Sequence, residues 1–473
     1  MAMVEQPATY MEESDAFSWH MERDPLLRST VVIVLVFDRS PDFALLRDKV
    51  ERASRSIPGL RHKVVETPFR LAPPRWTVDP DFDLSWHLRQ IEAPHPRTLS
   101  GVLDLARIIG MAGFDRARPM WEWTVAEGLE GGEAAVVLKL HHSLTDGIGG
   151  MRLAASLFDL DREPADLEVM PVAPEPEDLS PVDLLTDTLQ YSWRRLSGFA
   201  RQRTASTLDD TWHAIRHPVD TAGNAFQTLR SVAKTVRPVT DTLSPLMTER
   251  RLGWHYEVLD VPTDDLKRAA NAVGGTLNDA FLGGVTGGLR RYHDRHEASC
   301  KDLRVTLPIS IRHAEDPVGG NRITLMRFTI PAGILDPVER MRAVHELTSE
   351  ARAEPSIPHT NAIARALNLL PSGLVGEMLK HVDFVASNIP GLMMPLYIGR
   401  ARLERFYAFG PTLGAAVNIT LLSYCDSCGI GVNTDVGAVP DPQVLMDCLR
   451  EGFEEILDLG GTHGAVVLPT RAF

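Results

Sequence analysis

Apolar and polar positions along the chain predict a mixture of strands and helices. Residues 31–37 (VVIVLVF) are all apolar and rich in β-branched side chains, which predicts a buried strand. Residues 42–57 carry apolar side chains at helical spacing. Two more strands are predicted at 121–127 and 134–140, and the glycine-rich segment GLEGGE between them predicts a hairpin turn.

A second group of elements begins near residue 251 with the strand-like segment WHYEVLDVP. Residues 263–295 predict two helices separated by Gly274-Gly275, and the GGVTGG segment in the second helix indicates close helix packing. Three strand-like segments, a hairpin and a closing helix at 441–457 follow. The segments are LRVTLPISIR, ITLMRFTI, VDFVASNIPG and the hairpin AAVNITLLSYCDSCGIGVNTD, which we expect to turn at Asp426-Ser427.

The chain between these groups changes composition twice. Residues 159–188 contain ten Asp or Glu and one Arg, with interspersed prolines, which is typical of a linker or surface excursion. Residues 192–237 reverse the balance, with eight Lys or Arg and three Asp. This basic stretch is either a solvated helical connection or an amphipathic surface that rests on anionic lipid. The second interpretation predicts weaker liposome binding after charge reversal of its first four arginines, Arg194, Arg195, Arg201 and Arg203.

These patterns predict an α/β (α+β) protein of two subdomains. A chain of 473 residues is too long for one ordinary core. We expect an N-terminal subdomain at 1–158, a connection at 159–250 and a C-terminal subdomain at 251–473.

Composition narrows the classes of partner and compartment. The net charge of −14 argues against nucleic acid, because phosphate would be repelled. Four cysteines are too few for a disulfide framework, which favours the cytoplasm. The N-terminal residues lack the apolar segment of a signal peptide, and no apolar run approaches the roughly 20 residues of a membrane span.

The segment HHSLTDG (141–147) is the main candidate for chemistry, because it places two histidines at the end of a predicted strand. Consecutive strand residues point to opposite faces, so one of His141 and His142 can enter a cavity while the other supports it or faces elsewhere. Zinc ligand spacing and the G-x-S-x-G hydrolase motif are absent, and Cys425 and Cys428 form a single CxxC, interpreted as a reduced turn pair. A lone general base or a structural histidine pair remain as interpretations.

HHSLTDG resembles the HHxxxDG motif of the acyltransferase superfamily that includes chloramphenicol acetyltransferase and peptide-synthetase condensation domains. RPMWE (118–122), LNDAF (277–281) and SNIPG (387–391) resemble motifs of the bacterial wax ester synthase/diacylglycerol acyltransferase family, in the family's order. LPISIR (307–312) resembles its arginine-bearing strand. The resemblance covers nearly the whole chain. Met120 and Ile389 replace the family's leucine and valine, which bears on acyl-chain preference more than on chemistry.

The resemblance implies roles for the residues of the HHxxxDG motif. His142 is the implied base, and His141 orients its neighbour. Asp146 is implied to be structural, with Arg312 as its partner, and Gly147 permits the turn.

The segment that contains Asn278 predicts a helix start. Thr276 and Asp279 can form a capping box, which makes Asp279 structural. Asn278 is then either an ordinary first-turn residue or an oxyanion donor at the positive end of the helix.

A substrate tunnel between two chloramphenicol-acetyltransferase-like halves is the fold that the resemblance implies. Its candidate lining residues are Pro119, Met120, Trp121, Ser387, Asn388 and Gly391. Trp121 and Met120 also fit an ordinary core position, and Ser387, Asn388 and Gly391 fit a tight turn.

The resemblance implies a CoA-dependent transfer of a long-chain acyl group to diacylglycerol, or to long-chain alcohols to give wax esters. It implies acyl-CoA as co-substrate, no bound cofactor or metal, and peripheral contact with a membrane or lipid droplet. Two other functions remain open from the sequence: a non-catalytic lipid-binding relative, and a condensation-type enzyme that uses a carrier-protein thioester.

Overall fold

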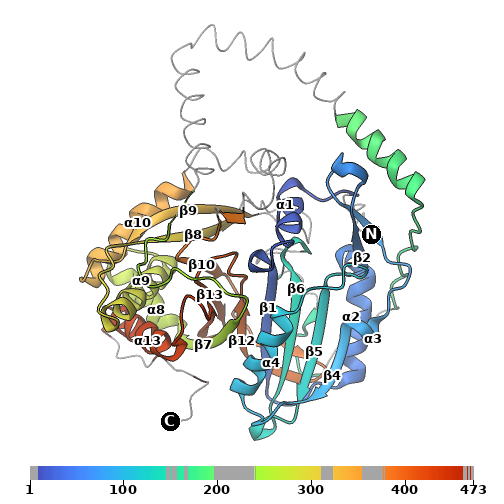
Figure 1. Ribbon diagram of the computed structural model, residues 1–473. Helices are drawn as coiled ribbons and strands as arrows, with labels where there is room; N and C mark the ends of the chain where they lie inside the picture. Colours follow the sequence, from blue (N-terminus) through green and yellow to red (C-terminus); the bar gives the residue numbers. More distant parts are fainter. Residues whose placement is uncertain are drawn as a thin grey trace, which may run out of the picture.

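Two six-stranded sheets organise the chain in a computed structural model (Figure 1). The structure describes residues 9–144, 150, 157–163, 169–195, 239, 241–310, 323–353, 376–377, 379–461, 466 and 469.

The first sheet is mostly antiparallel, with β4 and β5 as its parallel pair. Its strands, in spatial order, are β11 (Tyr397–Ile398), β12 (Ala401–Phe409), β1 (Thr30–Phe37), β6 (Ala134–His141), β5 (Trp121–Glu127) and β4 (Leu88–Glu92). The predicted strands at 31–37, 121–127 and 134–140 are confirmed, as is the turn between the last two. A short ladder of β2 (His62–Val65) and β3 (Arg75–Val78) lies apart from this sheet.

The second sheet is mixed, with β10 parallel to both of its neighbours. Its strands are β7 (Trp254–Pro262), β14 (Ser427–Asp435), β13 (Val417–Tyr424), β10 (Phe384–Ile389), β8 (Asp302–Ser310) and β9 (Ile323–Pro331). All the strands predicted after residue 251 form. The β13–β14 hairpin turns at Cys425-Asp426, because Tyr424 pairs with Ser427. The expected turn at Asp426-Ser427 is wrong by one residue, and Cys425 has a positive φ of 50°.

Helices cover both sheets. Those of the first half are α1 (Glu13–Met21), α2 (Phe43–Ser56), α3 (Leu84–His87) and α4 (Leu99–Met111). Those of the second half are α8 (Thr263–Ala272), α9 (Leu277–Arg295), α10 (Pro337–Arg352) and α13 (Pro442–Asp458). The predicted helices at 42–57, 263–295 and 441–457 are therefore confirmed, and Gly274 separates α8 from α9 with a φ of +72°.

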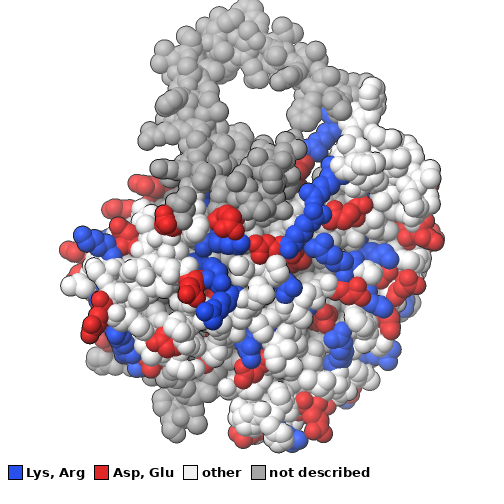
Figure 2. Space-filling model, viewed as in Figure 1, with Lys and Arg blue, Asp and Glu red and all other residues white. Residues whose placement is uncertain are grey.

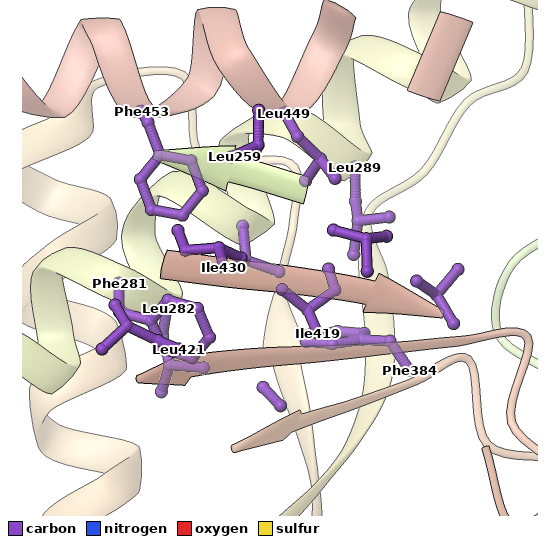
Figure 3. Packing of buried hydrophobic residues seen from close by; sticks show 14 of the residues in the cluster. Leu259, Phe281, Leu282, Leu289, Phe384, Ile419, Leu421, Ile430, Leu449 and Phe453 are labelled. Carbon is purple, nitrogen blue, oxygen red and sulfur yellow. The ribbon is translucent and has the colours of Figure 1, made fainter. Parts of the chain in front are cut away.

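The core of the second half lies between its sheet and the α9–α13 pair (Figure 3). Phe281 and Leu289 from α9 and Phe453 from α13 are fully buried against Leu259 and Ile430 of the sheet. The predicted role of the GGVTGG segment in close helix packing is confirmed, because a Cβ at Gly288 would lie 2.7 Å from the Cα of Leu449 on α13.

Two strands of the second half of the chain, β11 and β12, belong to the first sheet. β12 pairs with β1, with Val32 opposite Phe409. It also contacts β13 and β14 of the second sheet. Gly429 and Gly431 of β14 permit this approach, because a Cβ at either position would overlap a carbonyl oxygen of β12. In space, the first sheet therefore also contains β11 and β12, which lie beyond the expected boundary at residue 251.

The acidic stretch read as a linker ends in a helix at residues 181–195. Arg195 of this helix forms an ion pair with Glu13 at 2.6 Å, so it faces the protein. Arg201 and Arg203 lie outside the described residues. Among the helices that the structure describes, none combines the length and apolar character needed to cross a bilayer.

Candidate active site

Strand β6 carries the histidine pair into the interior. Its register places His141 opposite Thr30 on β1. Side chains alternate along the strand, so Lys139 and His141 share one face while Leu138 and Leu140 share the other. The side chain of His141 is completely buried, whereas His142 leaves the strand as the first residue of the 3-10 turn η5 (His142–Leu144) and is half-buried. The two rings have different environments because β6 ends at His141 and His142 already belongs to the turn.

The tautomer of His141 follows from its neighbours. The backbone N–H of Ser143 donates to Nδ1 of His141 at 3.1 Å, and the Ser143 hydroxyl lies 2.7 Å from the same atom. Since a backbone N–H can only donate, Nδ1 must be an acceptor. Neutral His141 therefore carries its proton on Nε2.

Glu22 faces that proton and was not found from the sequence. Its Oε1 lies 3.2 Å from Nε2 of His141, although the contact does not meet the geometry of a hydrogen bond. The same oxygen accepts the Ser29 N–H at 3.1 Å. Burial alone would raise the pKa of Glu22, but His141, the Ser29 N–H and nearby Arg116 more than offset it and lower the pKa. Glu22 is therefore a largely buried carboxylate held in its charged form.

Ser29 links this carboxylate to His142. Its N–H donates to Glu22, while its carbonyl oxygen accepts the backbone N–H of His142 at 2.9 Å. The position of His142 thus depends on the β1 entry segment as well as on β6. No local motif in the sequence signals this link, because the three residues come from separate segments.

Aromatic and cationic groups surround His141. The rings of Trp19 and Phe114 present their edges to it at 5.9 and 6.1 Å between centroids. Lys139 lies 4.2 Å from the centre of the Phe114 ring and 3.2 Å from Glu122, and burial lowers the pKa of its ammonium. The His141 ring therefore lies between two aromatic side chains and is shielded from solvent.

The RPMWE segment leads into β5 and packs beside β6 in the core. Pro119 is buried, and the carbonyl of fully buried Met120 accepts the His141 N–H at 3.0 Å. Trp121 is buried beside the His87 ring at 4.4 Å, and its indole N–H donates to Leu60 at 2.8 Å. Met120 and Trp121 therefore occupy core positions, which was one of their two interpretations. The other interpretation, lining of a substrate tunnel, stays a prediction.

The start of α9 has the predicted capping box. Asp279 accepts the backbone N–H of Thr276 at 2.8 Å, while the Thr276 side chain accepts the Asp279 N–H. Asp279 also accepts from His345 at 2.8 Å. Asn278 is half-buried in the first turn, and Nδ2 of Asn388 approaches its Oδ1 at 3.5 Å. Two motifs far apart in the sequence therefore meet here.

The SNIPG segment connects this point to the histidine strand. Half-buried Ser387, Asn388 and Ile389 end β10. Ile389 packs in the same apolar cluster as Leu140 and Leu144, which flank the two histidines in sequence. Gly391 is required by a close approach, because a Cβ there would overlap the carbonyl of Ser423.

Three candidate residues, Asp146, Gly147 and Arg312, lie outside the described residues. The proposed Asp146–Arg312 pair therefore stays a prediction. Within the described ranges, no group of three or more His, Cys, Asp or Glu could hold a metal ion. All four cysteines are unpaired thiols, with Cys425 and Cys428 beside the β13–β14 turn.

Comparison with known families decides the class. A family model described as the wax ester synthase/diacylglycerol acyltransferase catalytic domain matches residues 11–281, and the C-terminal domain model of the same family matches 319–457. The chain belongs to the wax ester synthase/diacylglycerol acyltransferase family. It is therefore an acyltransferase, a class whose co-substrate is acyl-CoA, as the motifs predicted.

Relatives in the family span almost the same length. A Mycobacterium tuberculosis protein, named a candidate diacylglycerol O-acyltransferase, is 35% identical over 452 residues, which cover 95% of this chain and 91% of that protein. A second candidate diacylglycerol O-acyltransferase of that organism is 28% identical over 433 residues, covering 87% and 88%.

Solved structures confirm the fold class. The wax ester synthase/diacylglycerol acyltransferase from Marinobacter aquaeolei VT8 matches with a TM-score of 0.63 and 21% identity, over 96% of this chain and all of that one. The first condensation domain of the calcium-dependent antibiotic synthetase matches with a TM-score of 0.65 and 18% identity, over 98% of this chain and all of that one. At these identities the likeness concerns the fold alone, and the interface tunnel stays a prediction.

Proposed function

We propose that this chain transfers a long-chain acyl group from acyl-CoA to the free hydroxyl of diacylglycerol, giving triacylglycerol. Long-chain alcohols are the second acceptor class, giving wax esters. Family membership supports the reaction class, and the names of the M. tuberculosis relatives favour diacylglycerol. A water-insoluble acceptor also requires the protein, which we place in the cytoplasm, to work at a lipid surface.

His142 is the proposed general base. It accepts the proton of the acceptor hydroxyl as the oxygen bonds to the thioester carbonyl carbon. The carbon–sulfur bond then breaks, and His142 returns the proton to the CoA thiolate. No acyl-enzyme forms, so both substrates are bound together.

Asn278 is the proposed oxyanion donor. Its Oδ1 faces Asn388, so the other arm of the amide, the NH₂ group, is directed elsewhere at the N-terminus of α9. An amide donor there can stabilise the tetrahedral intermediate together with the positive end of the helix.

The observation that carries this proposal is the contrast between the two histidines. The ring of His141 is completely buried, with Nδ1 accepting the Ser143 N–H and Nε2 3.2 Å from Glu22, whereas half-buried His142 is held at Ser29 by its backbone N–H. A ring positioned through the backbone can exchange a proton without loss of its anchor.

The proposal is tested by CoA release from palmitoyl-CoA. We expect release only when diacylglycerol or hexadecanol is added, with thin-layer detection of the ester. His142→Ala should lower the rate by at least about 1000-fold, while His95→Ala, which changes an exposed histidine, should not.

Other outcomes identify other functions. Release without an acceptor indicates a thioesterase. Absence of release with any alcohol favours a lipid-binding protein, and release only from a carrier-protein thioester favours a condensation-type enzyme.

A further inference from the structure

The helix at residues 181–195 exposes its apolar side. Val182, Leu185, Leu189 and Trp193 are all exposed, and Trp193 retains 74% of its accessible surface. Their spacing of three or four residues places them along one stripe of the helix. A helix at the surface of a water-soluble domain normally directs such a stripe inward.

The opposite side of this helix is polar and bound to the protein. Thr188 is fully buried, and Asp187 lies 3.5 Å from Arg75. Arg195 pairs with Glu13, and the Tyr191 ring lies 4.2 Å from that of Tyr10. These contacts fix the rotation of the helix about its axis, so the apolar stripe cannot turn inward without breaking them.

A neighbouring loop extends the same surface. Phe69 is 88% exposed in the turn η3 (Pro68–Arg70), and Leu71 follows it. The Ser192 hydroxyl donates to the Leu71 carbonyl at 2.9 Å, which joins the loop to the helix. We define the outer ridge by its exposed apolar side chains: Phe69, Leu71, Val182, Leu185, Leu189 and Trp193.

On the outer ridge, an arginine follows each of the two exposed aromatic residues in sequence. Phe69 is followed by exposed Arg70, and Trp193 by exposed Arg194. Asp183 is an exposed acid on the same helix, where it accepts the Ser180 hydroxyl at 2.6 Å. In Figure 2 the upper right of the molecule, where Figure 1 draws this helix in green, is mostly white with Lys and Arg along its inner margin.

We propose that the outer ridge docks the enzyme on an anionic lipid surface, with Phe69 and Trp193 in the interfacial layer and Arg70 and Arg194 at the headgroups. Aromatic side chains beside arginines are suited to this layer, because the ring leaves water while the cation meets phosphate. The choice of lipid over a protein partner rests on the proposed function, whose acceptor is dissolved in lipid.

The test compares variants of the full chain in vesicle flotation. The vesicles contain phosphatidylcholine with or without phosphatidylglycerol. F69S/W193S should bind phosphatidylglycerol vesicles about tenfold or more weakly than the unaltered chain. The control I108S/L335S removes two exposed apolar side chains outside the outer ridge and should bind normally. R70Q/R194Q should lose the preference for phosphatidylglycerol.

The outcomes separate docking from catalysis. F69S/W193S should retain CoA release with a short-chain, water-soluble alcohol and lose it with vesicle-borne diacylglycerol. Unchanged flotation of F69S/W193S overturns the proposal. So does a wild-type dimer in sedimentation equilibrium that F69S/W193S converts to monomer, because the ridge then binds a second copy. Flotation that depends on the ridge, without CoA release from any substrate, refutes the proposed function alone.

Discussion

At the scale of single residues, the candidate site depends on Glu22 and Ser29 as much as on the histidines. Glu22 provides a negative charge beside the Nε2 proton of His141, and Ser29 holds the backbone of His142. A largely buried carboxylate in this position stabilises positive charge that develops on a neighbouring imidazole. We therefore assign Glu22 as a positioning residue that acts through His141.

Glu22→Gln tests this assignment. The amide preserves size and can still accept from Ser29, but it removes the charge, so kcat should fall by about 10- to 100-fold. Loss of the negative charge disfavours protonated histidine, so the acid limb of the pH dependence of kcat/KM should move to lower pH. The measurement is a pH–rate profile with the melting temperature alongside. A lower Tm with an unmoved pH profile would mean that Glu22 is only structural.

At the scale of elements, glycine determines how α9 meets α13. Gly284 and Gly288 of α9 face Gly452 of α13, and their backbones lie closer than any side chain allows. Fully buried Arg340 of α10 joins the same junction, where it donates to the Gly283 carbonyl and pairs with Glu455. The backbone atoms of the pair cannot move aside as a flexible side chain would.

Gly452→Ala should consequently destabilise the protein. Its Cβ would overlap backbone atoms of Gly284 and Gly288, and overpacking of this kind costs about 1–3 kcal/mol. Urea unfolding followed by circular dichroism measures the loss. Gly333→Ala is the matched control, because its Cβ would make only ordinary contacts at 3.4 Å and beyond. Equal stability of the two variants would contradict the close crossing.

At the scale of the whole molecule, β12 holds the two halves together. Tyr407 of β12 donates to Asp260 of β7 at 2.9 Å, so a hydrogen bond joins the two sheets. Burial raises the pKa of Asp260 to about 6, against the opposing effects of Tyr407 and Arg405. Lys380 pairs with Asp24, just after α1, at 2.8 Å and adds a second connection between the halves.

The raised pKa of Asp260 makes stability depend on pH. The unfolded carboxyl ionises near its ordinary pKa of about 3.9, so folding is opposed increasingly as pH rises toward 6 and by a constant amount above it. Asp260→Asn should therefore stabilise the protein, and its gain at pH 8 should exceed that at pH 5 by about 1 kcal/mol. Urea unfolding at both pH values measures this. Asp426→Asn, in an exposed turn, should show no such difference.

Local sequence patterns were sufficient to predict most helices and strands. In the candidate site they also predicted the start of α9. Apolar segments rich in strand-forming residues predicted β1, β5, β6 and the strands of the second half, and the spacing of Thr276 and Asp279 predicted the capping box that forms. These features depend on neighbours within a few residues, so the sequence alone contains the information. The order of the motifs likewise indicated the family that the family models match.

Tertiary structure alone decided which distant segments meet. It brought Glu22 and Ser29 to the histidines, Asn388 to Asn278, and β12 into the first sheet. It also turned the apolar side of the helix at 181–195 outward, a helix that begins in the predicted acidic linker and ends in the basic stretch. Such contacts arise only when whole helices and strands pack together. The spacing of apolar residues and turn propensity are local properties, so they do not specify a partner far away in the chain.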